Sequence, residues 1–328
     1  MDVATSIDLI RLAVIPLFLY TAVTDIKRRR APDWVWGILV VVAVALLIVE
    51  VLLVIPPINT PRGWIYMIQA TTTIGLAVGF GAIGHMFGLM GGADTKAIVS
   101  VGLLYPTYPY SILGQYGFPV SGALSVTGVD MIANGFIFAA AYPVIIAVHN
   151  LRHSNIFTRM FLTVKTPVDS LPSMYGRVAP TPKHLSPTSV DLDTLRMYLA
   201  WRQATVTDIR AHSEEYRSGN ARTSDSVGDG TVESYRRLVD DAEEHEEAES
   251  VSDADSSEDP WRVDEFADHA DSRFHGTEPD DLRELLDEIA SSPRSPLWVS
   301  PGIPLLAPLA IGVVFTILYG SLIVAVML

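Results

Sequence analysis

Two aspartates that stand far apart in the sequence adjoin apolar segments and could act together in hydrolysis. Asp25 follows the first apolar segment, and Asp94 lies between the third and the fourth. Two carboxylates that share a site cannot easily both ionise, so one of them keeps a proton. The charged carboxylate can activate water while the neutral one polarises a carbonyl group. These residues therefore predict peptide hydrolysis by an aspartic pair.

The remaining residue types limit the other chemistries open to the chain. It contains no cysteine, which excludes disulfides, thiol nucleophiles, iron–sulfur clusters and thiolate zinc sites. Its histidines are scattered along the chain, and we expect none of them to hold a metal. We therefore expect a site that uses neither a metal nor another cofactor.

Long apolar segments must position these aspartates. The first two segments each approach the roughly 20 residues that cross a hydrocarbon core of about 30 Å. In the third, Gly75 and Gly79 have the spacing of small residues that let helices pack closely in lipid. The sequence predicts an all-α polytopic membrane protein with about six transmembrane helices, near residues 6–23, 34–55, 64–90, 95–113, 131–148 and 303–328.

Basic residues beside the segments predict their orientation. The cluster at 27–30 follows the first segment, and Arg152, Arg159 and Lys165 follow the fifth. Loops that carry such an excess of positive charge are cytoplasmic. We expect a multi-pass protein of the cell membrane with both termini outside. Asp25 and Asp94 then lie at the same cytoplasmic face, although 69 positions separate them.

The predicted organisation has three parts: a membrane domain over 1–150, a cytoplasmic acidic insert over 151–297 and a final transmembrane helix over 298–328. Residues 191–288 hold 29 acidic and 10 basic side chains, a net charge of about −19. Because the whole chain has a net charge of −14, the rest of the chain is slightly basic. An acidic chain with only four lysines is typical of proteins that stay soluble at high ionic strength, so we expect a halophilic source.

The insert is expected to be partly helical and largely disordered. Apolar residues recur at helical spacing over 191–216, and 278–290 resembles a second short helix. Between them, residues 218–259 are rich in Asp, Glu and Ser and have too few apolar side chains to offset chain entropy. We predict a solvated linker there.

The surroundings of both aspartates resemble one family of membrane proteases. In the archaeal type IV prepilin and preflagellin peptidases, a first catalytic Asp is followed by basic residues and then by Pro-Asp or Pro-Asn at positions seven and eight. Asp25 with Pro32 and Asp33 is similar to this pattern. These enzymes are membrane aspartic proteases known by the motif Gly-x-Gly-Asp.

The second half of the resemblance surrounds Asp94. The family motif Gly-x-Gly-Asp is followed by Lys two positions after the Asp. The sequence Gly91-Gly92-Ala93-Asp94-Thr95-Lys96 matches it, except that Ala93 replaces the second Gly. If that position requires a positive φ, alanine adds strain, and if it requires only a small side chain, alanine serves.

A weaker similarity lies at 301–308, which resembles the Pro- and Gly-rich start of the family's final helix. The resemblance covers 1–150 and 298–328 and leaves the insert unmatched.

The resemblance implies an aspartic endopeptidase that removes the short basic leader from prepilins and preflagellins at the cytoplasmic face. It implies Asp25 and Asp94 as the catalytic pair, supported by Gly91, Gly92, Ala93, Lys96, Pro32 and Asp33. The partners would be the precursor proteins and the lipid bilayer, with no nucleic acid, and the source would be haloarchaeal. Bacterial relatives also methylate the new N-terminus and often carry a cysteine tetrad, for which this chain offers no residues.

Two other functions remain as alternatives. The chain could be a transporter whose intramembrane carboxylates bind a cation, although such proteins usually show internal repeats and mid-bilayer sites. It could also be an adaptor that recruits a partner through the acidic insert. On a purely structural interpretation, Asp25 would be a helix cap or a topological anchor. Lys96 could lower the pKa of Asp94 or mark the cytoplasmic edge.

Overall fold

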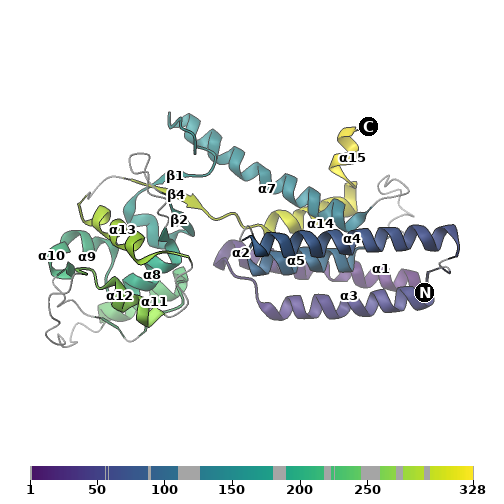
Figure 1. The fold of residues 1–328 in the computed structure, drawn as a ribbon, viewed down its shortest axis with the longest axis horizontal. Coiled ribbons are helices and arrows are strands. Elements are labelled where there is room, and N and C mark those ends of the chain that lie inside the picture. The colour runs from purple at the N-terminus through teal and green to yellow at the C-terminus, as the bar shows by residue number, and fades with distance from the viewer. Residues whose placement is uncertain are drawn as a thin grey trace. The chain divides into compact units, whose positions relative to one another are not determined.

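The computed structural model describes the chain in two compact units (Figure 1). The membrane unit comprises residues 1–142 and 303–328, and the insert unit comprises residues 143–302. Most of the chain is helical. The described residues are 2–55, 57, 59–87, 90–109, 126–179, 190–217, 223–224, 226–244, 259–270, 276–291 and 296–327.

Among the described residues, four helices are long and apolar enough to cross a membrane: Val3–Arg28, Asp33–Leu53, Pro61–Met86 and Thr127–Arg152. The first consists of α1 (Val3–Ala13) and α2 (Ile15–Arg28), and the others are α3, α4 and α7. They coincide with the first, second, third and fifth predicted segments, and they indicate a membrane-embedded protein.

The two other predicted spans are shorter than expected. Helix α5 (Gly92–Leu104) has 13 residues and α14 (Leu306–Tyr319) has 14. At 1.5 Å per residue each extends roughly 20 Å, which is less than the hydrocarbon core of about 30 Å. Helix α14 ends at Gly320, whose φ is 87°, and α15 (Leu322–Met327) follows. The prediction that the fourth segment continues to 113 extends outside the described residues.

Close helix packing occurs at other glycines than the sequence suggested. A Cβ atom added at Gly75 or Gly79 would meet nothing within 4 Å, so the expectation of tight packing there is wrong. At Gly102 it would lie 2.3 Å from the Cβ of Ala77, where α5 meets α4. At Gly312 it would lie 2.4 Å from the backbone nitrogen of Gly135, where α14 meets α7.

The insert unit contains a four-stranded antiparallel sheet, which departs from the expected all-α fold. Its order is β1 (Val164–Thr166), β4 (Leu297–Pro301), β2 (Gly176–Val178), β3 (Val190–Asp191). Along β4, Leu297 and Val299 are buried while Trp298 between them is partly exposed, so one face of the sheet covers the core. The strands are too short to show this alternation in the sequence.

Helices of the insert pack against the other side of an apolar core that includes Trp201, Trp261 and Phe266. The helices predicted over 191–216 and 278–290 are confirmed. The helical elements are η2 (Val168–Ser173), α8 (Leu192–Trp201), α9 (Val206–Ala211), α10 (Ser213–Arg217), α11 (Val232–Glu244), α12 (Val263–Ala270) and α13 (Pro279–Ser291).

The expectation of a solvated linker over 218–259 is wrong for its described part. Helix α11 lies within this range, Val227 is buried in the core, and Tyr235 packs against it. The range has few apolar residues on average, but two of them, Val227 and Tyr235, contact the core. Residues 245–258 of the predicted linker lie outside the described residues.

Candidate active site

Asp25 lies in the last turn of α2, where a backbone turn fixes the end of the helix. Arg29, directly after α2, has a φ of 53°, and its backbone N–H donates to the carbonyl oxygen of Asp25 at 2.9 Å. The Asp25 side chain is half-buried. Helix α2 therefore ends one turn beyond Asp25, and the Asp25 carboxylate lies at the edge of the packed helices, partly exposed.

Asp94 is the third residue of α5 and folds back over the start of that helix. Its Oδ2 accepts a hydrogen bond from the backbone nitrogen of Gly91 at 3.3 Å. The Thr95 hydroxyl donates to the carbonyl oxygen of Gly91 at 3.2 Å. Because the first N–H groups of a helix lack intrahelical partners, a carboxylate there is stabilised in place. The Asp94 side chain is also half-buried.

The two carboxyl groups lie close enough to interact electrostatically. Helix packing brings them together, because α14 packs along α2, α5 packs against α3 and α4, and α14 also contacts α5. In this way two carboxylates from distant parts of the sequence come to share one region of the membrane unit.

The start of α14 meets Asp25. The backbone N–H of Leu306, the first residue of α14, donates a hydrogen bond to the Asp25 carboxyl group, and the charged Arg29 side chain lies nearby. The other oxygen, Oδ2, is buried and has no hydrogen-bond partner among the residues that the structure describes. The segment 301–308 thus delivers a helix N-terminus, with its positive dipole end, to one of the two aspartates.

Lys96 pairs with Asp33, the first residue of α3. Its Nζ lies 2.6 Å from Asp33 Oδ1. The pair is exposed, with 48% of the Lys96 side chain and 81% of the Asp33 side chain accessible, so it contributes little stability. Pro32 caps α3 in an extended conformation with a φ of −67°. Lys96 and Asp33 join the N-termini of α5 and α3 beside the carboxylates.

Ala93 fits its position without strain. It lies in the first turn of α5, and it is not among the described residues with a positive φ. Gly91 is extended, with a φ of −68° and a ψ of 162°. A Cβ atom at Gly91 would lie 3.4 Å from Asp94 Oδ2, and one at Gly92 would meet nothing within 4 Å. These positions keep the space beside Asp94 open and do not need the special torsions of glycine.

A buried ionic network in the membrane unit is absent from the sequence-based predictions. Arg11 donates to Glu50 through both terminal nitrogens, at 3.2 and 2.6 Å, and lies 3.6 Å from Asp8. Tyr66 donates to Glu50 at 2.8 Å, and the Tyr105 hydroxyl donates to the carbonyl oxygen of Arg11 at 2.6 Å. The sequence did hold a sign of this network, because Asp8 and Arg11 lie inside the first apolar segment and Glu50 lies inside the second.

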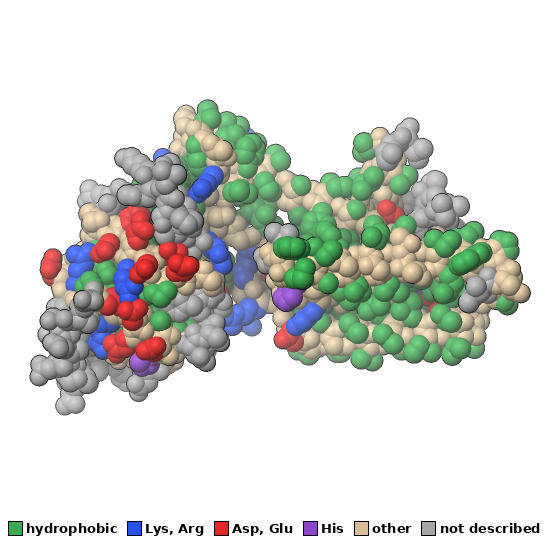
Figure 2. All heavy atoms as spheres, viewed as in Figure 1, with side chains coloured by type: hydrophobic (Ala, Val, Ile, Leu, Met, Phe, Trp, Pro, Cys, Tyr) green, Lys and Arg blue, Asp and Glu red, His purple; other side chains and the backbone are tan. Residues whose placement is uncertain are grey.

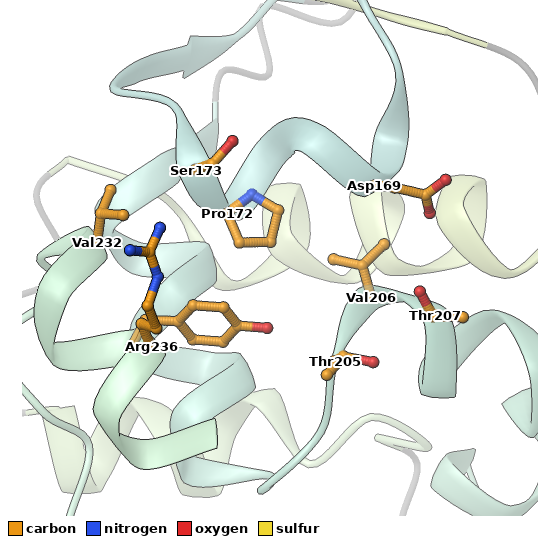
Figure 3. Close-up of a pocket in the computed structure, with 9 residues that line it drawn as sticks. Asp169, Pro172, Ser173, Thr205, Val206, Thr207, Val232 and Arg236 are labelled. Atoms are coloured by element: carbon orange, nitrogen blue, oxygen red, sulfur yellow. The ribbon is translucent and has the colours of Figure 1, made fainter. Parts of the chain in front are cut away.

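The insert unit holds a separate pocket of about 290 Å³ between η2, α9 and α11 (Figure 3). Arg236 from α11 lies on the side of Ser173, and Thr207 from α9 and Thr205, directly before α9, line another side. The carboxylate of Asp169 at its rim is already paired with Arg210. Asp169 is the only acidic side chain among the described residues that line this pocket.

Comparisons with known proteins add no relative. No family model, no curated protein and no solved structure matches the chain. Among the described residues there is also no group of three or more His, Asp or Glu side chains that could hold a metal ion. The candidate site is the region of the membrane unit where the carboxyl groups of Asp25 and Asp94 approach each other.

Proposed function

We propose that the chain is a membrane aspartic endopeptidase in which Asp25 and Asp94 form the catalytic pair. The observation that carries this proposal is the approach of their carboxyl groups at the junction of α2, α5 and α14. A buried carboxylate oxygen without a protein partner, such as Asp25 Oδ2, is costly and is expected mainly at functional sites. We further propose that the chain belongs to the archaeal prepilin and preflagellin peptidases that its motifs resemble.

The surroundings of the two groups suggest their roles. Burial disfavours the charged form of both carboxyl groups. The Arg29 charge and the N–H of Leu306 act in the opposite sense on Asp25, and a charged Asp25 disfavours a second negative charge on Asp94. In the proposed reaction, Asp25 accepts a proton from water as the water oxygen attacks the scissile carbonyl carbon. Asp94 gives its proton to the carbonyl oxygen. When the C–N bond breaks, Asp25 passes its proton to the leaving amine and Asp94 recovers one from the intermediate.

The proposed substrate is a precursor with a short basic leader before a hydrophobic segment. The leader's positive charge suits a protein with a net charge of −14, although salt limits this attraction to roughly 10 Å at 0.1 M. The open space beside Gly91 and Gly92 would admit an extended peptide backbone to Asp94.

The direction of α7 supports the predicted topology of the membrane unit. A Cβ atom at Gly128, near the start of α7, would lie 2.6 Å from Thr73 of α4, and further along α7 Phe136 contacts Phe80 of α4 with ring centroids 5.3 Å apart. Helix α7 therefore runs in the direction of α4, which ends just before Asp94. We propose that Arg152 emerges on the cytoplasmic side with the two aspartates.

A cleavage assay tests the proposed function. Membranes carrying the wild type, Asp25→Asn, Asp94→Asn or Asp2→Asn would be mixed with a tagged prepilin or preflagellin, and loss of the leader followed by gel shift at high salt. Asp2 is exposed near the start of α1, so Asp2→Asn is a matched control. We expect cleavage by the wild type and the control and none by the other two variants at equal abundance. Cleavage by both variants would favour the transporter or adaptor alternatives.

A further inference from the structure

The end of α7 and the loop after it carry an exposed mixture of apolar and basic side chains. We call residues 148–165 the basic-apolar segment. Its most exposed large apolar residues are Ile156 at 74%, Leu162 at 55%, and Phe161 and Leu151, both at 47%. Such side chains, standing together on a surface, mark a site of interaction.

The charge of this segment differs from that of the rest of the chain. No Asp or Glu occurs between Asp130 and Asp169, although the chain has 37 acidic residues. Arg152, Arg159 and Lys165 are all exposed within the segment. Figure 2 shows hydrophobic and basic side chains together over the end of α7 and β1. The partner that suits this surface must offer both negative charge and an apolar phase.

The segment is held in a defined shape. Asn150 is fully buried and donates to the carbonyl oxygens of Met160 and Thr163, both at 2.7 Å. This pair of hydrogen bonds folds the loop back onto the last turn of α7, so that Ile156, Phe161 and Leu162 are presented outward.

Trp298 of β4 adds a side chain typical of membrane interfaces. Its ring is partly exposed and lies against Phe157, with the centroids 4.3 Å apart. Lys165 Nζ lies 5.2 Å from the centroid of the same ring. Tryptophan and long basic side chains are enriched where protein meets the headgroups of a bilayer.

The segment also has the right position in the chain. Helix α7 has 26 residues, and about 20 suffice to cross the hydrocarbon core. The residues that directly follow such a helix must leave the bilayer through the headgroup layer. We propose that the basic-apolar segment binds the membrane surface, with its apolar side chains among the headgroups and its basic side chains on anionic lipids.

The absence of cysteine makes a direct test possible. Ile156→Cys and Leu162→Cys would each be labelled with an environment-sensitive fluorophore in the full-length protein, which would be reconstituted in phosphatidylcholine vesicles with or without phosphatidylglycerol. Thr207→Cys, at an exposed position of α9, is the matched control. Quenching by lipids that carry a nitroxide near the headgroup would be measured.

We expect several-fold stronger lipid quenching at 156 and 162 than at 207, and stronger quenching in the anionic vesicles. Replacing Arg152, Arg159 and Lys165 together by Gln should reduce quenching in anionic vesicles to the level seen without phosphatidylglycerol. Arg236→Gln with Arg237→Gln, both exposed on α11, should leave it unchanged. Equal quenching at all three labelled positions, or in both vesicle types, would overturn the proposal, as would a blue shift without lipid quenching.

Discussion

At the scale of single residues, the position before Asp94 does not need the backbone freedom of glycine, because its φ is not positive. Ala93 is helical and packs against the apolar core of the membrane unit. We predict that Ala93→Gly leaves leader cleavage nearly unchanged and lowers stability by up to about 1 kcal/mol, because glycine is a poorer helix former. Cleavage rate and the unfolding midpoint in detergent measure the two effects. A marked rise in cleavage would show that the backbone at 93 is strained.

The ion pair between Lys96 and Asp33 gives a second prediction at this scale. Because both groups are exposed, Lys96→Ala should cost no more than about 1 kcal/mol and should slow cleavage only modestly. Exchange of the two charges, Asp33→Lys with Lys96→Asp, should recover part of the loss in cleavage rate at low salt. If Lys96→Ala abolishes cleavage and the exchange does not help, Lys96 acts on Asp94 or on the substrate instead.

The sequence indicated the two aspartates and the residues beside them in the chain, but not the contacts that helix packing adds. The spacing of Asp25 from Pro32 and of Asp94 from Lys96 is local and can be read from the chain. The hydrogen bond from Leu306 to Asp25 joins residues at opposite ends of the sequence, so only the packed helices reveal it. The partner of Lys96 is likewise set by the approach of α5 to α3.

At the scale of elements, the buried network of Arg11, Glu50 and Asp8 joins α1 to α3. We predict that Arg11→Met destabilises the membrane unit by about 3–5 kcal/mol, because it leaves Glu50 and Asp8 buried without their counter-ion. The double variant Arg11→Met with Glu50→Leu should recover part of this loss. Thermal unfolding in detergent measures both, with the exposed Arg62→Met as control. An Arg11→Met effect no larger than that of Arg62→Met would contradict the network's role.

The contact of α14 with α7 gives another prediction for an element. A methyl group at Gly312 would lie 2.4 Å from the backbone nitrogen of Gly135, so α14 must shift to accept it. Gly312→Ala should therefore cost about 1–3 kcal/mol and slow cleavage, since α14 carries Leu306 to Asp25. Gly79→Ala, where a methyl group meets open space, should have neither effect. Equal behaviour of the two variants would contradict this packing.

The sequence revealed long elements better than short ones. Four membrane helices follow from apolar length alone. The strands of the insert have only three, five, three and two residues, too few for a period of two to stand out. The pairing of β4 with β1 and β2 also joins residues more than 100 positions apart, as for Lys165 and Trp298. A composition that predicted disorder therefore concealed a folded unit.

At the scale of the whole molecule, the acidic insert is a folded unit whose stability depends on pH. Burial alone would raise the pKa of Asp259, but hydrogen bonds from Arg283 and from the backbone of Asp264 and Val263 outweigh it and lower that pKa. Arg283 reaches both carboxylate oxygens, at 3.0 and 3.1 Å. This carboxylate thus ties the loop before α12 to α13.

The lowered pKa fixes the sign of the effect. Because an unfolded aspartate has a pKa of about 3.9, the stabilisation by Asp259 is complete above that pH and is lost as the pH falls through the lower folded-state value. We predict that Asp259→Asn costs roughly 1–3 kcal/mol near neutral pH and that its difference from the wild type shrinks below about pH 4. Urea unfolding followed by tryptophan fluorescence measures this. An unchanged difference down to pH 2, or an equal loss in the exposed Asp240→Asn, would contradict it.

The most direct test of the account asks whether Asp25 and Asp94 occupy one site. Because the chain lacks cysteine, Asp25→Cys with Asp94→Cys introduces a single pair of thiols that a short bifunctional thiol reagent can bridge in membranes. The positive control is Asp33→Cys with Lys96→Cys, because the native Lys96 Nζ lies 2.6 Å from Asp33 Oδ1. The negative control is Asp2→Cys with Asp25→Cys, because these positions lie at opposite ends of the first span. We predict that the Asp25 and Asp94 positions cross-link as readily as the positive control. Cross-linking no greater than in the negative control, while the positive control reacts, would contradict the shared site.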